Sequence, residues 1–277
     1  MSQTPSVGIR GDVPGGTLGV IDAMGMGWRL LMSDFWPLWL VGLVALLLLM
    51  VANSVPFGQC IAGPPLVAGF FWVLMRRIDG GEANVGGLFE GFRQRFVPSI
   101  ISVLPLLIAW LVFAVIYIVL YLLAVLPTIM HAHSGAGAAP EKMLIFVLPV
   151  LGVNVLLSLA ISVIQMFFIF ALVAVWDYPL SGWEAARVSM RMVWERFWSV
   201  LGFCVLAWLI GVAASVGWFA CCVGILFTLP VAMVWVGGAV VYLYRSWTGQ
   251  ALAQPIGAAP PAGPVPPTSI EPPPRGM

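Results

Sequence analysis

The sequence predicts an all-α integral membrane protein with six transmembrane helices, and three observations support this class. The 277-residue chain is 61% hydrophobic and only 8% charged, whereas soluble domains carry about 25% charged residues. Its uncharged runs are long enough to cross a bilayer, which takes about 20 apolar residues each time. Its cations gather in segments that would share one side of the membrane. The sequence lacks the alternating segments that indicate a membrane β-barrel.

Four uncharged runs contain the expected spans. The runs are Phe35–Met75, Phe96–Met130, Met143–Trp176 and Phe197–Tyr244. The first and last are long enough for two crossings each, with turn signals at 53–60 and 215–222. Together the runs predict six spans, arranged as three hairpins.

The cations predict the topology. With six spans, eleven of the twelve Lys and Arg residues fall on the side that also holds both termini, and Lys142 alone falls on the other. Because positive residues accumulate on the cytoplasmic side of membrane proteins, both termini are expected in the cytoplasm.

Each hairpin has an amphipathic segment before it. The stretches 86–96 and 182–198 place apolar side chains on one helical face and charged ones on the other, with Arg191 and Glu195 spaced as a pair. These segments are interpreted as helices lying in the membrane interface, or alternatively as extensions of the following spans. The stretch 29–36 aligns with 191–198, so the first and third hairpins are a possible parallel repeat.

The chain ends differ from the middle in composition. Residues 1–20 lack a compact apolar core and are expected to form a flexible N-terminal tail, and residues 21–246 form the membrane domain. Residues 247–277 contain nine prolines with Gly and Ala, which predicts a disordered, Pro-rich cytoplasmic tail of polyproline II character. It either keeps the protein soluble or docks on a partner.

Four polar side chains lie within the uncharged run Met143–Trp176 and share one face of a helix. Asn154, Ser158, Ser162 and Gln165 fall within a sector of about 80° on a helix. Such a face must avoid lipid, because an unpaired amide in hydrocarbon costs several kcal/mol. It is therefore either an interhelical packing face or the lining of a polar path or cavity.

The sequence predicts no catalytic, metal or cofactor-binding residue. His131 and His133 lie in a Gly/Ala-rich loop without a third ligand, and membrane-protease motifs are absent. The cysteines lack CxxC spacing. The sequence does not decide whether Cys60 forms a disulfide with Cys221 or Cys222.

Several arginines on the cytoplasmic side are candidate contacts for lipid headgroups, because they flank the spans or belong to the amphipathic segments. They are Arg76, Arg77, Arg93, Arg95, Arg187 and Arg191.

Two stretches of the sequence contain a recognisable set of motifs. A PLxAG helix that leads to a GxLFxGF segment, followed later by an EAxxxS helix, is matched by a set of residues within 63–203. The set is Pro65, Leu66, Ala68, Gly69, Gly87, Leu88, Phe89, Gly91, Phe92, Glu184, Ala185 and Ser189. These motifs resemble those of a family of uncharacterised bacterial multi-pass membrane proteins, and similar domains accompany some glycerophosphodiester phosphodiesterases. The resemblance implies a bacterial inner-membrane location and carries no activity with it.

We therefore expect a non-catalytic membrane protein, a scaffold, assembly factor or accessory subunit. Its expected partners are membrane lipids, another membrane protein or a second copy of the chain, and not nucleic acid. The alternative is a transporter or channel for an uncharged or amphipathic solute, with Asn154 and Gln165 in its path. A lipid-modifying enzyme would need a catalytic dyad that the sequence lacks.

Overall fold

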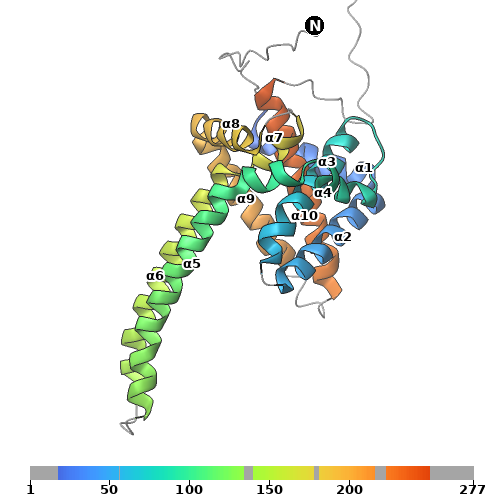
Figure 1. Ribbon diagram of the computed structural model, residues 1–277. Helices are drawn as coiled ribbons and strands as arrows, with labels where there is room; N and C mark the ends of the chain where they lie inside the picture. Colours follow the sequence, from blue (N-terminus) through green and yellow to red (C-terminus); the bar gives the residue numbers. More distant parts are fainter. Residues whose placement is uncertain (1–17, 56, 134–139, 178–180, 216–222, 250–277) are drawn as a thin grey trace, which may run out of the picture.

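The structure is a computed structural model that describes residues 18–55, 57–133, 140–177, 181–215 and 223–249 (Figure 1). Within these ranges the protein is helical and contains no strand. Six of the described segments are long and apolar enough to cross a membrane. The predicted class, an all-α multi-pass membrane protein with six spans, is confirmed.

The spans correspond to six segments of the long helices. The helices are α2 (Phe35–Ser54), α3 (Gly58–Ile78), α5 (Phe96–His133), α6 (Pro140–Phe167) with α7 (Ala171–Asp177), α9 (Phe197–Ser215) and α10 (Val223–Thr248). The α2–α3 turn lies inside the predicted stretch 53–60, and α9 ends at the start of the predicted stretch 215–222. In contrast to the prediction of a loop, His131 and His133 belong to the last turn of α5.

Short helices precede three of the spans. They are α1 (Val20–Ser33), the 3₁₀ helix η1 (Val85–Phe89) with α4 (Glu90–Gln94), and α8 (Gly182–Glu195). The stretch 86–96, expected to be one helix, is thus divided into η1, α4 and the start of α5.

The three junctions between a short helix and its span have similar geometry. A single non-helical residue separates the two helices, and the span then begins at a phenylalanine. Its backbone angles are φ −152° and ψ 59° at Asp34, φ −130° and ψ 25° at Arg95, and φ −127° and ψ 34° at Arg196. This agreement is compatible with the proposed repeat, which stays a prediction.

Each short helix packs on a span of another hairpin. The α1 helix lies against α10, η1 and α4 lie against α3, and α8 lies against α5 and α7. Glycines allow these close approaches: a Cβ added at Gly27 would be 2.5 Å from the carbonyl oxygen of Trp235, and one at Gly91 would collide with the carbonyl oxygen of Pro65. The Trp235 indole also donates a hydrogen bond to the carbonyl of Met24 at 2.8 Å.

The buried core lies where α3, α7 and α10 meet. Phe70 and Leu74 of α3, Val173 of α7 and Tyr244 of α10 are almost completely buried. The ring of Phe170, just before α7, lies 6.3 Å from Tyr244 and 5.5 Å from Trp247. We refer to this region as the helix-end core.

A break separates α6 from α7 at residues 168–170. Ser189 of α8 supports it: its hydroxyl donates to the carbonyl of Phe167 at 2.8 Å and accepts from the N–H of Phe170 at 3.3 Å. Ser189 is fully buried, so one side chain satisfies backbone groups that the break releases inside a span.

The α5–α6 hairpin projects away from the other helices, and we call it the arm (Figure 1). The 38 residues of α5 span about 57 Å at 1.5 Å per residue, well beyond a hydrocarbon core of about 30 Å. Its described contacts with the body lie near its base, where Leu106 and Ile164 pack on Phe168 and Ala186. Many apolar side chains farther along are exposed, such as Leu111 and Leu156.

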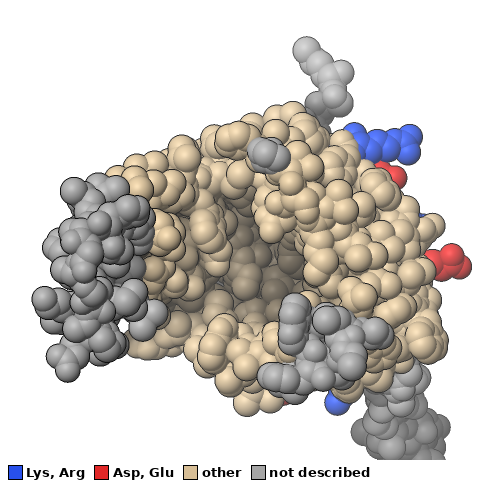
Figure 2. Space-filling view, turned by 90° about the horizontal axis from the view of Figure 1, so that it is seen from below, with Lys and Arg blue, Asp and Glu red and all other residues tan. Residues whose placement is uncertain are grey.

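Seen from below, the molecule has a deep hollow (Figure 2). Uncharged residues line the part in view, and the charged side chains in view lie at the outer edge of the molecule, away from the hollow. The hollow opens on the side of the molecule that faces down in Figure 1.

Candidate functional site

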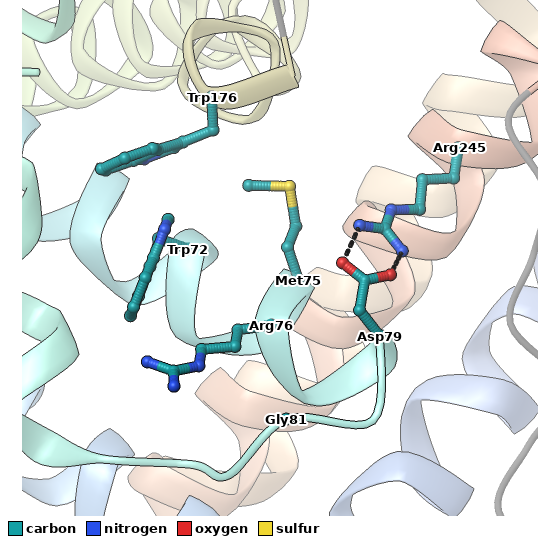
Figure 3. A pocket seen from close by; sticks show the side chains of 7 residues that line it. All are labelled: Trp72, Met75, Arg76, Asp79, Gly81, Trp176 and Arg245. Carbon is teal, nitrogen blue, oxygen red and sulfur yellow. Dashed lines mark hydrogen bonds and ion pairs between the residues drawn. The ribbon is translucent and has the colours of Figure 1, made fainter.

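A pocket of about 380 Å³ lies at the end of the helix-end core (Figure 3). Residues from the last turns of α3 and α7, from α10 and from the loop after α3 line it. They are Trp72, Met75, Arg76, Asp79, Gly81, Trp176 and Arg245. The pocket thus depends on all three helices being correctly packed.

One wall of the pocket is an ion pair. Arg245 donates to both carboxylate oxygens of Asp79, with Nη1–Oδ1 at 2.5 Å and Nη2–Oδ2 at 2.8 Å. The Arg245 side chain is only 8% exposed, whereas that of Asp79 is 54% exposed. A two-point contact of this kind fixes both position and orientation, so it joins α10 to the end of α3.

The opposite wall carries a second arginine. The Arg76 guanidinium lies over the Trp72 ring, 5.2 Å from its centroid, in a cation–π contact that holds it in place. The neighbouring Arg77 turns away: its Nε lies 3.4 Å from a carboxylate oxygen of Asp34, and its Nη1 donates to the carbonyl of Gly81 at 3.3 Å.

Two indoles form the remaining apolar wall. The ring centroids of Trp72 and Trp176 are 6.0 Å apart, and buried Met75 lies between them and the ion pair (Figure 3). The Trp176 N–H donates to the carbonyl of Ala68 at 2.7 Å. The pocket therefore combines a held cation with a rigid aromatic surface.

The predicted headgroup arginines do not form one cluster. Arg76 lines the pocket and Arg77 is paired, while Arg95 is half-buried at a helix junction. Arg93, Arg187 and Arg191 are exposed on α4 and α8. Arg187 lies over the Trp183 ring at 5.6 Å, and Arg191 forms the predicted pair with Glu195 at 3.0 Å.

The sequence did not indicate Asp79, Arg245 or the two tryptophans as a site. Asp79 and Arg245 are 166 positions apart, so no local spacing reveals their pairing. The only available signal was that Arg76, Asp79 and Arg245 each follow an apolar run, which places them at the same membrane level.

The polar face of α6 lies on the arm, away from the pocket. Ser158, Ser162 and Gln165 are exposed and Asn154 is half-buried. The Ser162 hydroxyl donates to the carbonyl of Ser158 at 2.7 Å. The Gln165 side chain has no hydrogen-bond partner among the described residues. Within the described part of the chain, this face is therefore not a buried seam.

Other candidate groups remain separate. Cys60 is exposed and Cys204 half-buried, both as free thiols, while Cys221 and Cys222 lie outside the described residues. Among the described residues no three His, Cys, Asp or Glu side chains are grouped as metal ligands.

Comparisons with protein-family models, curated proteins and solved structures gave no match.

Proposed function

We propose that this protein is a non-catalytic membrane component, an assembly factor or accessory subunit, that binds another membrane protein through its arm. The observation that carries the proposal is the exposed, unpartnered amide of Gln165. This residue lies near the middle of the span Gly152–Trp176. A partner that accepts and donates hydrogen bonds there would remove a cost of several kcal/mol in hydrocarbon.

The rest of the arm supports the same proposal. Only 17% of the most apolar part of Phe96–Val119 is buried, against 61% for Gly58–Ile78 in α3. Polar side chains act as adhesive between membrane helices, contributing about 0.6–2 kcal/mol per hydrogen bond. Ser158 and Ser162 next to Gln165 also allow close backbone approach. The partner is a helix of another membrane protein or of a second copy.

The topology proposed with this function places both termini in the cytoplasm of a bacterium and the spans in its inner membrane. The cation distribution supports this orientation. The short helices lie at one end of the spans (Figure 1), where Trp183 and Trp194 of α8 are exposed. Exposed indoles at this level are suited to the membrane interface.

Native mass spectrometry after mild extraction from the source membrane tests this proposal. The wild type should carry a stoichiometric membrane protein or a second copy, and Gln165→Leu should lose most of it. Val163→Leu is the matched control, because Val163 is exposed on the opposite face of α6. A wild type that is monomeric, or a Gln165→Leu complex as abundant as the control, would contradict the proposal.

The hollow in Figure 2 favours a second candidate, a transporter for an uncharged or amphipathic solute. The two proposals differ in water access. Single cysteines placed at positions 154–165 in a background without the four native cysteines should react with a polar thiol reagent in a conduit. They should stay unreactive where a partner helix covers the face, and reactivity along the whole face would favour transport.

A further inference from the structure

The pocket at the helix-end core carries an excess of positive charge. Two arginines and one aspartate line it. The Asp79 carboxylate is engaged at both oxygens by Arg245. Arg76 is exposed and has no acidic partner among the described residues. Arg76 is therefore the cation of this pocket that can bind a further anion.

We propose that this pocket binds a phosphate group, and that the phosphate belongs to an anionic phospholipid headgroup. A guanidinium presents its donors in a planar fork that matches phosphate oxygens. The stacking of Arg76 on Trp72 holds the fork at the pocket wall. Binding one phosphodiester, with a single negative charge, leaves the pocket neutral.

The size and walls of the pocket fit a headgroup better than a bare ion. Its volume of about 380 Å³ falls in the range of small-molecule sites, about 300–1,000 Å³. The indoles of Trp72 and Trp176 offer apolar surface for the glycerol backbone beside the phosphate. Both tryptophans lie near the ends of candidate spans, the level at which tryptophans meet headgroups.

The charge of Arg76 is needed for phosphate binding, because the backbone at the end of α3 repels an anion. The C-terminal end of α3 presents carbonyl groups and a partial negative charge. Arg76 and Arg77 lie in its last turn, but Arg77 is turned toward Asp34. Without the charge of Arg76, the pocket would hold only the Arg245–Asp79 pair beside a negative helix end.

The test measures lipid binding by the full-length protein in detergent, using native mass spectrometry with added dioleoylphosphatidylglycerol. Arg76→Gln should lower the apparent affinity about tenfold, the loss of one charge-assisted contact. Arg29→Gln is the matched control: it removes one charge from α1, at the same end of the spans, but Arg29 is exposed and lies outside the pocket. The control should change affinity less than about twofold.

Two further measurements locate the site and identify the source of the phosphate. A phosphatidylglycerol with a photoreactive headgroup should crosslink to peptides containing residues 72–81 or Trp176, and Gln165→Leu should leave that crosslinking unchanged. Excess inorganic phosphate should not displace the lipid. Displacement, with no crosslinking at the pocket, would reassign the site to a free phosphate and overturn the lipid source.

Equal affinities for Arg76→Gln and Arg29→Gln would overturn the phosphate site itself. Arg76→Lys guards against a folding artefact, because it keeps the charge and should retain more binding than Arg76→Gln. If both Arg76 variants fold and bind as well as the wild type, the pocket does not bind phosphate.

Discussion

The helix-end core and the arm both contain spans apolar enough to cross a membrane, and the more apolar span, that of the arm, is the less buried. Gly58–Ile78 of the core is 61% buried over its most apolar part, and Phe96–Val119 of the arm only 17%. The helices differ in their glycines: α3 contains Gly69, which contacts the backbone of Leu88 in η1, whereas α5 contains no glycine. Hydrophobicity places a helix in the membrane, and small residues decide whether other helices can approach it.

The largest difference in stability between the two regions is expected when one glycine in each is replaced by alanine. A Cβ at Gly69 would collide with the backbone of Leu88, whereas one at Gly152 of the arm meets nothing within 4 Å. Gly69→Ala should lower the free energy of unfolding by about 3 kcal/mol, because backbone cannot move aside cheaply. Gly152→Ala should leave stability unchanged or slightly raised.

Thermal unfolding in one detergent, followed by circular dichroism, measures both variants. Equal melting temperatures for Gly69→Ala and Gly152→Ala would break the comparison, since they would mean that α3 and η1 are not in close contact.

The second test concerns the ion pair that closes the core. Asp79→Asn should destabilise the protein by about 2 kcal/mol, because it leaves the buried charge of Arg245 without its carboxylate. The control, Glu195→Gln, breaks the exposed Arg191–Glu195 pair at 3.0 Å and should cost less than about 0.5 kcal/mol. Denaturant unfolding of the two variants compares them, and similar losses would show that burial of Arg245 does not matter.

Much of the fold was predictable from the sequence, because it depends on local properties. Runs without charge located the six spans, and the turn near residues 53–60 followed from its Pro, Gly and Asn. The break at 168–170 was not predictable, since "FIF" has no breaker and depends on a hydroxyl from Ser189, about 20 residues later.

The candidate site was predictable only in part. Arg76 was selected because it ends an apolar run, but the same reasoning selected Arg77, which pairs with Asp34 instead. The pairing of Asp79 with Arg245, and the approach of Trp176 to Trp72, depend on how α3, α7 and α10 pack. The four polar residues of the predicted face belong to α6, but their exposure depends on where the arm points, which the sequence does not give.

The third test compares two serines. Ser189 in the core serves two backbone groups at the α6–α7 break, whereas Ser162 on the arm donates only to its own helix. Ser189→Ala should cost about 1–2 kcal/mol, because it leaves buried backbone groups unpaired. Ser162→Ala should be near neutral. Hydrogen exchange should be faster across residues 165–175 in Ser189→Ala alone, and unchanged exchange there would mean that the break is supported otherwise.

The smallest expected effect lies at the start of α8, which positions Ser189. Ser181 and Glu184 form a capping box: the Ser181 N–H donates to the Glu184 carboxylate at 2.9 Å, and the Glu184 N–H donates to the Ser181 hydroxyl at 3.4 Å. Hydrogen bonds from the Ser181 backbone and hydroxyl lower the pKa of Glu184 below its ordinary 4.5, and Arg187 adds a smaller effect in the same direction. Such a carboxylate stabilises the helix fully above the ordinary pKa.

That stabilisation must disappear as the pH falls through the lowered pKa, because protonation then removes the acceptor that the folded state prefers. The melting temperature of the wild type should exceed that of Glu184→Gln at pH 7, and the difference should shrink below about pH 4.5. A difference that stays constant down to about pH 3 would mean that Glu184 stabilises α8 through its shape and not through its charge.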